Sequence, residues 1–279
     1  MRKFATYQNH KTLRYFFHIA YHGQAYHGWQ KNDTIESVQT VIEQKLTQVL
    51  KRNIFIVGCG RTDAQVNASQ YYFHLDVKEP LASDLLFKVN KALPADIAVF
   101  DILLMDDAAH ARFDAIQRQY DYFIHNYKDP FLNQHSAMYL GLELDTTKLK
   151  QATALLKNYT DYKCFCTSPD KKDNTLCIIN EVNWYINQDQ SRFRFQISAN
   201  RFLTKMIRII VGQLIRVATK KLSVDEFESY LIKQQTPAIL YPAHPQGLYL
   251  SKITYPYLNQ APKSSFLDLN FLEEQWELL

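Results

Sequence analysis

NIFIVGCGRTDAQVNASQYYFHLDV, residues 53–77, contains two apolar stretches separated by a polar segment. Both stretches, 53–58 and 70–77, are rich in aromatic and β-branched residues, which favours β-strands. The polar segment between them contains the sequence GRTD. We therefore expect two consecutive strands joined by a link that carries Arg61 and Asp63.

Two amphipathic helices flank this pair of strands in the sequence. Residues 37–50 and 83–94 place apolar side chains at helical spacing, and Ser83 is a candidate N-cap of the second helix. Further strands are predicted at 14–22 and 97–105. The resulting order, β-α-β-β-α-β, is that of the ferredoxin-like fold.

The same order of elements is predicted a second time. Strands are expected at residues 118–126, 178–186, 192–198 and 247–255, and helices at 146–159, 200–217 and after Ser223. We therefore predict an α+β protein of two ferredoxin-like halves, residues 1–112 and 113–279. If their sheets meet edge to edge, the seam forms a cleft suited to a ligand.

Local signals refine the ends of the second half. Asp145 is expected to cap one helix, and Ser223 forms a capping box with Glu226 at the start of another. The acidic tail, residues 264–279, is expected to form a short amphipathic helix.

Composition narrows the class of protein. Of the 279 residues, 47% are hydrophobic, which is ample for a core, yet no apolar run reaches membrane-spanning length. The N-terminal residues lack the apolar core of a signal peptide, and four cysteines in a chain of this length do not indicate a disulfide framework. We expect a cytoplasmic protein without a membrane partner.

The net charge of +4 does not by itself indicate nucleic acid. Residues 190–224, however, contain eight basic residues and no acidic one: Arg192, Arg194, Arg201, Lys205, Arg208, Arg216, Lys220 and Lys221. Such a run is either a solvated helix face or a stripe that contacts phosphates. The sequence leaves both interpretations open.

Candidate catalytic groups lie in the GRTD link. Arg61 and Asp63 are two residues apart, so in an extended link they project to the same side. An ionised carboxylate in a cleft can act as a nucleophile or a general base. The alternative, that Asp63 only bonds the backbone of its own turn, is at least as common for aspartate.

Two further features bear on a site. Arg201, Lys205 and Arg208 are spaced as one cationic face of the helix predicted at 200–217, and one of them could pair with Asp63. Tyr120 on its strand is either a core residue or a ring that stacks on a nucleobase.

The sequence contains no strong metal or cofactor signal. Cys164, Cys166 and Cys177 lack zinc-ligand spacing and a fourth ligand, the nine histidines form no HExxH pattern, and no glycine-rich phosphate loop occurs. We expect neither a metal nor a cofactor.

Five blocks resemble one known family. GRTDAQVNA (60–68) resembles GRTDAGVHA, the signature of the tRNA pseudouridine synthase A family. The others are YHGQAYHGWQ (21–30), HARFDAIQRQYDYFI (110–124), NRFLTKMIRIIVG (200–212) and PQGLYLSKITY (245–255), which are similar to that family's blocks and occur in its order. Together they span almost the whole chain.

The resemblance implies a pseudouridine synthase fold, with two ferredoxin-like halves around a central basic cleft. It implies a homodimer that isomerises uridine to pseudouridine in tRNA, in the anticodon stem-loop, without a cofactor. At matching positions, Asp63 would be the catalytic carboxylate, Arg61 would displace the target base, Tyr120 would stack on the uracil and Arg208 would pair with Asp63. Leu248 would line the pocket.

The sequence departs from the family pattern beside Asp63. Gln65 stands where the family has glycine, and Asn67 where it has histidine. We expect both to face the RNA, together with Arg201 and Lys205, and we hypothesise unchanged chemistry with a shifted choice of target. Restoring Gln65→Gly with Asn67→His tests this, because unchanged modification sites would contradict it.

The sequence also bears on two other classes of function. A non-catalytic tRNA-binding or RNA-folding module on the same scaffold is compatible with the altered signature, but all four catalytic positions are retained. A metal-dependent nuclease lacks clustered carboxylates or histidines. Turnover that depends on Asp63 separates the enzyme from the module.

Overall fold

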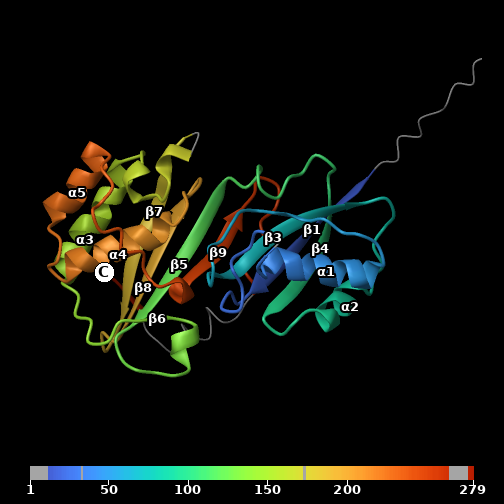
Figure 1. Ribbon diagram of the computed structural model, residues 1–279, viewed down its shortest axis with the longest axis horizontal. Coiled ribbons are helices and arrows are strands. Elements are labelled where there is room, and N and C mark those ends of the chain that lie inside the picture. The colour runs from blue at the N-terminus through green and yellow to red at the C-terminus, as the bar shows by residue number, and fades with distance from the viewer. Residues whose placement is uncertain (1–11, 33, 172–173, 264–275) are drawn as a thin grey trace, which may run out of the picture.

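The computed structural model describes residues 12–32, 34–171, 174–263 and 276–279. Within them, one sheet runs along the molecule in the order β10-β7-β8-β5-β9-β3-β1-β4, with β2 paired to β3 and β6 paired to β5. The helices α1 and α2 lie over one end of this sheet, and α3, α4 and α5 lie over the other (Figure 1). The protein is therefore a mixed α+β protein built on a large, mostly antiparallel sheet.

The first half supplies one end of the sheet. Its elements are β1 (Leu13–Tyr21), α1 (Val38–Leu50), β2 (Val57–Gly58), β3 (Asn67–Val77), α2 (Leu85–Ala92) and β4 (Ile97–Met105). In space the strands follow the order β4-β1-β3-β2. The strand predicted at 53–58 is shortened to two residues, but its position before the GRTD link is confirmed.

The second half repeats this spatial order as β9-β5-β8-β7. Its strands are β5 (Gln117–His125), β6 (Ala137–Met138), β7 (Ile179–Asn187), β8 (Arg192–Ala199), β9 (Leu248–Thr254) and β10 (Trp276–Leu278), and its α-helices are α3 (Thr146–Leu155), α4 (Met206–Ala218) and α5 (Val224–Lys233). Short 3-10 helices occupy Leu132–Gln134, Leu156–Asn158, Lys163–Phe165, Pro169–Lys171 and Pro245–Gly247.

The strands of the two halves meet edge to edge. At the seam β3 runs parallel to β9, pairing Asn67 with Tyr249 and Ala68 with Leu250. β9 in turn pairs antiparallel with β5. Because the GRTD link directly precedes β3, this pairing places Asp63 at the seam, on the same cavity as Leu248 of β9.

Most of the predicted helix starts are confirmed. The side chains of Ser37, Asp145 and Ser223 each accept a hydrogen bond from a backbone N–H in the first turn of their helix. The prediction for Ser83 is wrong, since α2 begins after Asp84. The helix expected in the tail is wrong at its end, where Trp276–Leu278 pairs with β7 as a strand, and residues 264–275 lie outside the described part of the chain.

The long helix predicted from residue 200 begins only at Met206. Lys205, immediately before it, has a φ of 59°, in the left-handed region that a helix interior excludes. The prediction that Arg201, Lys205 and Arg208 share one helix face is therefore wrong. Arg201 and Lys205 instead belong to a loop that leads into α4.

Aromatic packing in the first half holds the GRTD link. Trp29 is buried and stacks on Tyr71 with ring centroids 4.1 Å apart, and the Tyr71 hydroxyl donates to the carbonyl oxygen of Gly60 at 2.6 Å. A Cβ at Gly58 would stand 2.2 Å from that hydroxyl, so only glycine fits there. The link thus starts from a rigid part of the core.

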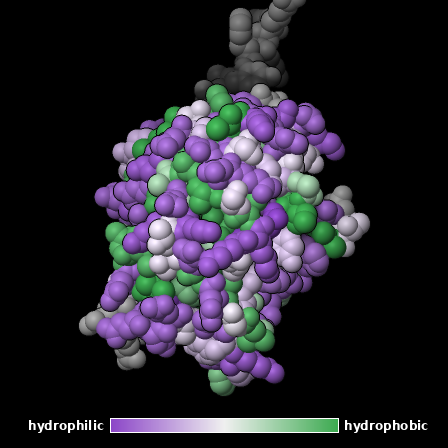
Figure 2. All heavy atoms as spheres, turned by 90° about the vertical axis from the view of Figure 1, so that its left-hand side faces the viewer, coloured by the Kyte–Doolittle hydropathy of each residue, from purple (hydrophilic) through white to green (hydrophobic). Residues whose placement is uncertain are grey.

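The outer surface of the second half is largely polar. Figure 2 shows the end of the molecule formed by α3 and α5, where hydrophilic side chains cover most of the face and apolar ones lie in separate patches. Scattered apolar side chains of this kind are ordinary on a protein surface. No helix among the described residues is long and apolar enough to cross a membrane.

Candidate active site

A cavity of about 690 Å³ lies at the seam between the two halves. The GRTD link, the segment that connects β4 with β5, the loop before α4 and the start of β9 all contribute to its wall. The charged residues that line it are Arg61, Asp63, Arg112, Arg118, Arg201, Lys205 and Arg208. Asp63 is the one carboxylate among the described lining residues, in a strongly basic surround.

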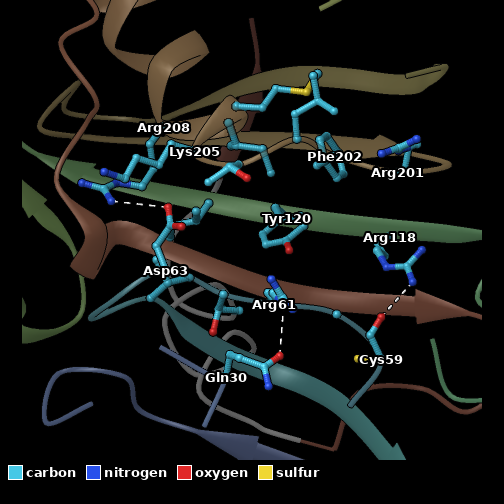
Figure 3. Close-up of a pocket in the computed structure, with 18 of the residues that line it drawn as sticks. Gln30, Cys59, Arg61, Asp63, Arg118, Tyr120, Arg201, Phe202, Lys205 and Arg208 are labelled. Atoms are coloured by element: carbon cyan, nitrogen blue, oxygen red, sulfur yellow. Dashed lines mark hydrogen bonds and ion pairs between the residues drawn. The ribbon is translucent and has the colours of Figure 1, made fainter. Parts of the chain in front are cut away.

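Asp63 faces Arg208 across this cavity (Figure 3). Arg208 Nη1 lies 3.5 Å from Asp63 Oδ2, and the two side chains are 14% and 25% exposed. Arg208 Nε also donates to the carbonyl oxygen of Ala243 at 2.7 Å, which fixes the guanidinium. The arginine therefore compensates and orients a carboxylate that stays accessible from the cavity.

The turn that carries Asp63 is closed by backbone groups rather than by its side chain. The N–H of Val66 donates to the Asp63 carbonyl oxygen at 3.2 Å, and the N–H of Trp29 donates to that of Thr62 at 3.3 Å. The hydroxyls of Tyr21 and Thr62 lie 2.9 Å apart. The carboxylate is thereby left to Arg208 and the cavity.

Arg61 lies on the same link but has a different partner. Its Nε donates to Gln30 Oε1 at 3.0 Å, and its side chain is exposed (Figure 3). Because this partner is a neutral amide at the surface, little holds the guanidinium in place. Arg61 can therefore swing without breaking the Asp63–Arg208 pair.

Tyr120 and Leu248 form the apolar floor of the cavity. Tyr120 is 8% exposed and meets Phe202 edge to face at 5.3 Å, while Leu248 on β9 is 5% exposed. Burial raises the pKa of the Tyr120 hydroxyl above its ordinary value, so it stays neutral. In Figure 3 the ring lies in the middle of the labelled side chains.

The basic run at 190–224 divides between two roles. Arg201, Lys205 and Arg208 line the cavity. Arg194, in contrast, donates to the buried Asp121 at 2.6 Å and lies over the Tyr185 ring. The run is therefore neither one solvated face nor one continuous stripe.

Arg118 is a residue of the site that the sequence reasoning missed. Its guanidinium donates to four backbone carbonyl oxygens, those of Cys59 at 2.8 Å, Arg112 at 2.9 Å, Ala115 at 3.1 Å and Asn200 at 3.3 Å. It thereby ties together the three segments that form the rim. Hydrogen bonds to backbone carbonyl oxygens cannot be predicted from the pattern of charged residues. The signal that could have indicated Arg118 is its position within the HARFDAIQR block.

The structure separates Gln65 and Asn67 from the other predicted site residues. Gln65 is exposed with a φ of 64°, which glycine adopts at less cost, and it does not line the cavity. Asn67 is 1% exposed; its Oδ1 accepts from the Gly23 N–H at 2.7 Å, and its Nδ2 donates to the Gln246 carbonyl oxygen at 2.9 Å. Asn67 thus fastens the two halves together inside the protein.

Replacing Asn67 by alanine is expected to lower the free energy of unfolding by about 2 kcal/mol, because it leaves the buried Gly23 N–H and the part-buried Gln246 carbonyl oxygen unpaired. Urea titration of the two proteins measures this. Gln65→Ala, at an exposed position with the same backbone angle before and after, is the control for the segment. A loss below about 0.5 kcal/mol for Asn67→Ala would contradict the structural role.

Histidines brace the segment between the halves. The backbone N–H of Ala111 donates to His74 Nδ1 at 3.2 Å, so His74 must be unprotonated at that nitrogen. Burial, followed by the charges of Arg14 and His110, lowers the pKa of His74 to about 4, against opposing contributions from Asp76 and Asp114. Protonation therefore breaks this brace.

A pH dependence of stability follows. Between the ordinary histidine pKa and the lowered value near 4, the unfolded chain binds the proton and the folded one does not. The thermal midpoint is therefore expected to fall as the pH is lowered from 7 to 5. His74→Asn keeps an acceptor but does not titrate, so it should weaken this dependence; an unchanged dependence would exclude His74 as its source.

The described residues contain no group of three or more histidine, cysteine, aspartate or glutamate side chains that could hold a metal ion. The four cysteines are all buried. Burial raises the pKa of Cys59 to about 11, which keeps the thiol beside the cavity protonated. Among the described lining residues, Asp63 supplies the carboxylate that faces the cavity.

Comparison with known proteins agrees with the resemblance noted in the sequence. The family described as tRNA pseudouridine synthase matches residues 157–256. The tRNA pseudouridine synthase A of Porphyromonas gingivalis is 36% identical over 246 residues, which cover 87% of this chain and 97% of that protein. Those of Azobacteroides pseudotrichonymphae and Bacteroides fragilis are 37% and 36% identical, each over 87% of this chain and over 97% and 96% of their own lengths.

These relatives define the class of protein as an isomerase that makes pseudouridine. The chain belongs to the tRNA pseudouridine synthase A family.

Proposed function

We propose that this protein isomerises uridine to pseudouridine in the anticodon stem-loop of tRNA, with Asp63 as the catalytic carboxylate. The observation that carries the proposal is the carboxylate itself, held 3.5 Å from Arg208 on the wall of a basic cavity. Phosphates of an RNA would be attracted by the surrounding guanidinium and ammonium groups. We further propose that the protein consists of two ferredoxin-like halves, residues 1–112 and 113–279.

The reaction needs no cofactor. The bond between N1 of uracil and C1′ of the ribose breaks, the base rotates, and C5 bonds to C1′; C5 loses a proton and N1 gains one. Asp63 either attacks the ribose or the uracil covalently or abstracts a proton. In both routes Arg208 orients the carboxylate.

Other lining residues assist binding. Tyr120 stacks on the uracil and keeps the detached base in place during its rotation. Leu248 packs on the base from β9, and Arg201 and Lys205 contact phosphates. Arg61, whose Gln30 partner is easily given up, occupies the position of the flipped nucleotide and so offsets part of the unstacking cost.

The remaining features of the proposal concern the context of the enzyme. It acts in the cytoplasm as a homodimer, with both subunits gripping one tRNA. An exposed Gln65 with a left-handed backbone, in place of the family's glycine, is the feature expected to alter the choice of target.

Pseudouridine mapping on a pool of unmodified tRNA transcripts tests this function. Wild-type protein should convert one or a few uridines, and their positions show whether the anticodon stem-loop is the target. Binding of tRNA without any conversion would instead favour a non-catalytic tRNA-binding module on the same scaffold.

A further inference from the structure

Phe113 is an exposed aromatic ring on the cavity wall. Its side chain is 75% exposed, and it stands in the segment between β4 and β5. Other phenylalanines of similar exposure, such as Phe55 at 74% and Phe131 at 85%, do not line the cavity. A phenylalanine left in water at the mouth of a polar site requires an explanation, because its burial elsewhere would be favourable.

The ring is held in a fixed position despite its exposure. The ring of His110 lies against it, with centroids 4.3 Å apart and planes tilted by 31°. His110 Nδ1 accepts from the backbone N–H of Arg112 at 3.1 Å and of Phe113 at 3.2 Å. His110 thus lies against the ring, yet Phe113 remains 75% exposed.

The backbone around Phe113 is fixed on both sides as well. Arg118 holds the carbonyl oxygens of Arg112 and Ala115, and the Tyr255 hydroxyl donates to that of Ala111 at 2.6 Å. A surface that is already ordered loses little entropy when a ligand binds to it. The exposed part of the Phe113 ring is therefore a preformed contact surface.

The charges nearby indicate which ligand would use this face. Arg112 lies over the Phe113 ring, with its guanidinium carbon 5.7 Å from the ring centroid. Arg61 and Arg201 belong to the same cavity. A flat apolar face among cations fits a molecule with flat bases and phosphates, which is single-stranded or splayed RNA.

We propose that Phe113 is a stacking platform for a nucleobase of the bound RNA next to the target uridine. Tyr120 is 8% exposed deep in the cavity, whereas Phe113 is at its rim, so the two rings serve successive bases along the strand. Phe113 thereby contributes to substrate binding and to the choice of sequence around the target. This inference rests on the proposed function.

The test compares Phe113→Ala with Phe55→Ala, a ring of equal exposure away from the cavity. Both are placed in a background of Asp63→Asn, and the Kd of an unmodified tRNA transcript is measured at fixed salt. We expect Phe113→Ala to weaken binding about 10-fold, the usual effect of one base stack, and Phe55→Ala to have no effect. The Kd of Phe113→Trp should equal that of the protein that retains Phe113, because tryptophan also stacks on a base. The Kd of Phe113→Leu should be raised as much as that of Phe113→Ala.

A second measurement tests whether Phe113 and a base of the RNA contact each other. In a transcript with an abasic site beside the mapped target, wild-type binding should weaken, and Phe113→Ala should cause no further loss. Fully additive losses would overturn the platform, as would equal effects of Phe113→Ala and Phe55→Ala. A thermal melt of each variant identifies a folding defect, in which case Phe113→Leu against Phe113→Trp decides.

Failure of the proposed function is distinguishable from failure of this inference. If the wild type binds tRNA but converts no uridine, the enzymatic proposal fails, yet the dependence of Kd on Phe113 still decides whether the ring binds RNA. If conversion occurs and the KM for tRNA is the same in wild type and Phe113→Ala, the function stands and the platform is wrong.

Discussion

Asp63→Asn is expected to lower the turnover of an unmodified tRNA transcript by at least about 10³-fold, as loss of a carboxylate that acts on the reacting atoms does. The Kd for the transcript should change by less than about 3-fold, because phosphate contacts dominate affinity. Single-turnover assays and filter binding measure the two quantities. The asparagine keeps the shape of the side chain and removes its charge.

A matched control is available in the same half of the protein. Asp84 is also an aspartate that forms an ion pair, with Lys88 Nζ 2.8 Å from Asp84 Oδ2. It does not line the cavity. Asp84→Asn should leave turnover unchanged. If Asp63→Asn retained a rate near that of the wild type, Asp63 would have no catalytic role and Arg208 would merely fasten the link.

Gly212→Ala is expected to lower the free energy of unfolding by about 2 kcal/mol or more, the cost of overpacking a rigid contact. In an ordinary helix this change is favourable by about 1 kcal/mol. Here a Cβ would stand 1.8 Å from the Tyr241 carbonyl oxygen and 3.1 Å from its carbon, so the backbone must move. The overlap outweighs the gain in helix propensity.

The same substitution should reduce turnover, because the displaced segment contains the carbonyl oxygen of Ala243 that fixes Arg208. Denaturant titration and single-turnover assays measure both effects. Gly60→Ala is the control for stability, since its Cβ would meet only Arg118 Nε, at 3.8 Å. A stabilised Gly212→Ala protein would show that α4 and the 241–243 segment can separate freely.

Much of the architecture could be predicted from residue patterns because it depends on local chemistry. Caps at Asp145 and Ser223 need only a side-chain oxygen at the right position. The strand predicted at 97–105 matches β4 residue for residue, since its apolar composition favours an extended chain. The order of elements in both halves was predicted for the same reason.

Where a local pattern competed with tertiary contacts, prediction failed. Residues 200–205 continue the helical spacing of α4, yet they form a loop in which Asn200 Oδ1 accepts from the N–H of Ile178 at 2.8 Å and of Arg201 at 2.9 Å. The spacing of apolar residues does not predict a hydrogen bond to a segment that is distant in the sequence. The tail likewise contains a strand at its end because β7 offers an open edge.

By itself, the sequence determined the mixed α+β class, the GRTD link, and, through five ordered blocks, the family. The tertiary structure alone decided that Asn67 lies inside and that Arg118 and Phe113 belong to the rim. The physical reason is distance along the chain. Propensities act over a few residues, whereas these contacts join residues up to 179 positions apart through the pairing of β3 with β9.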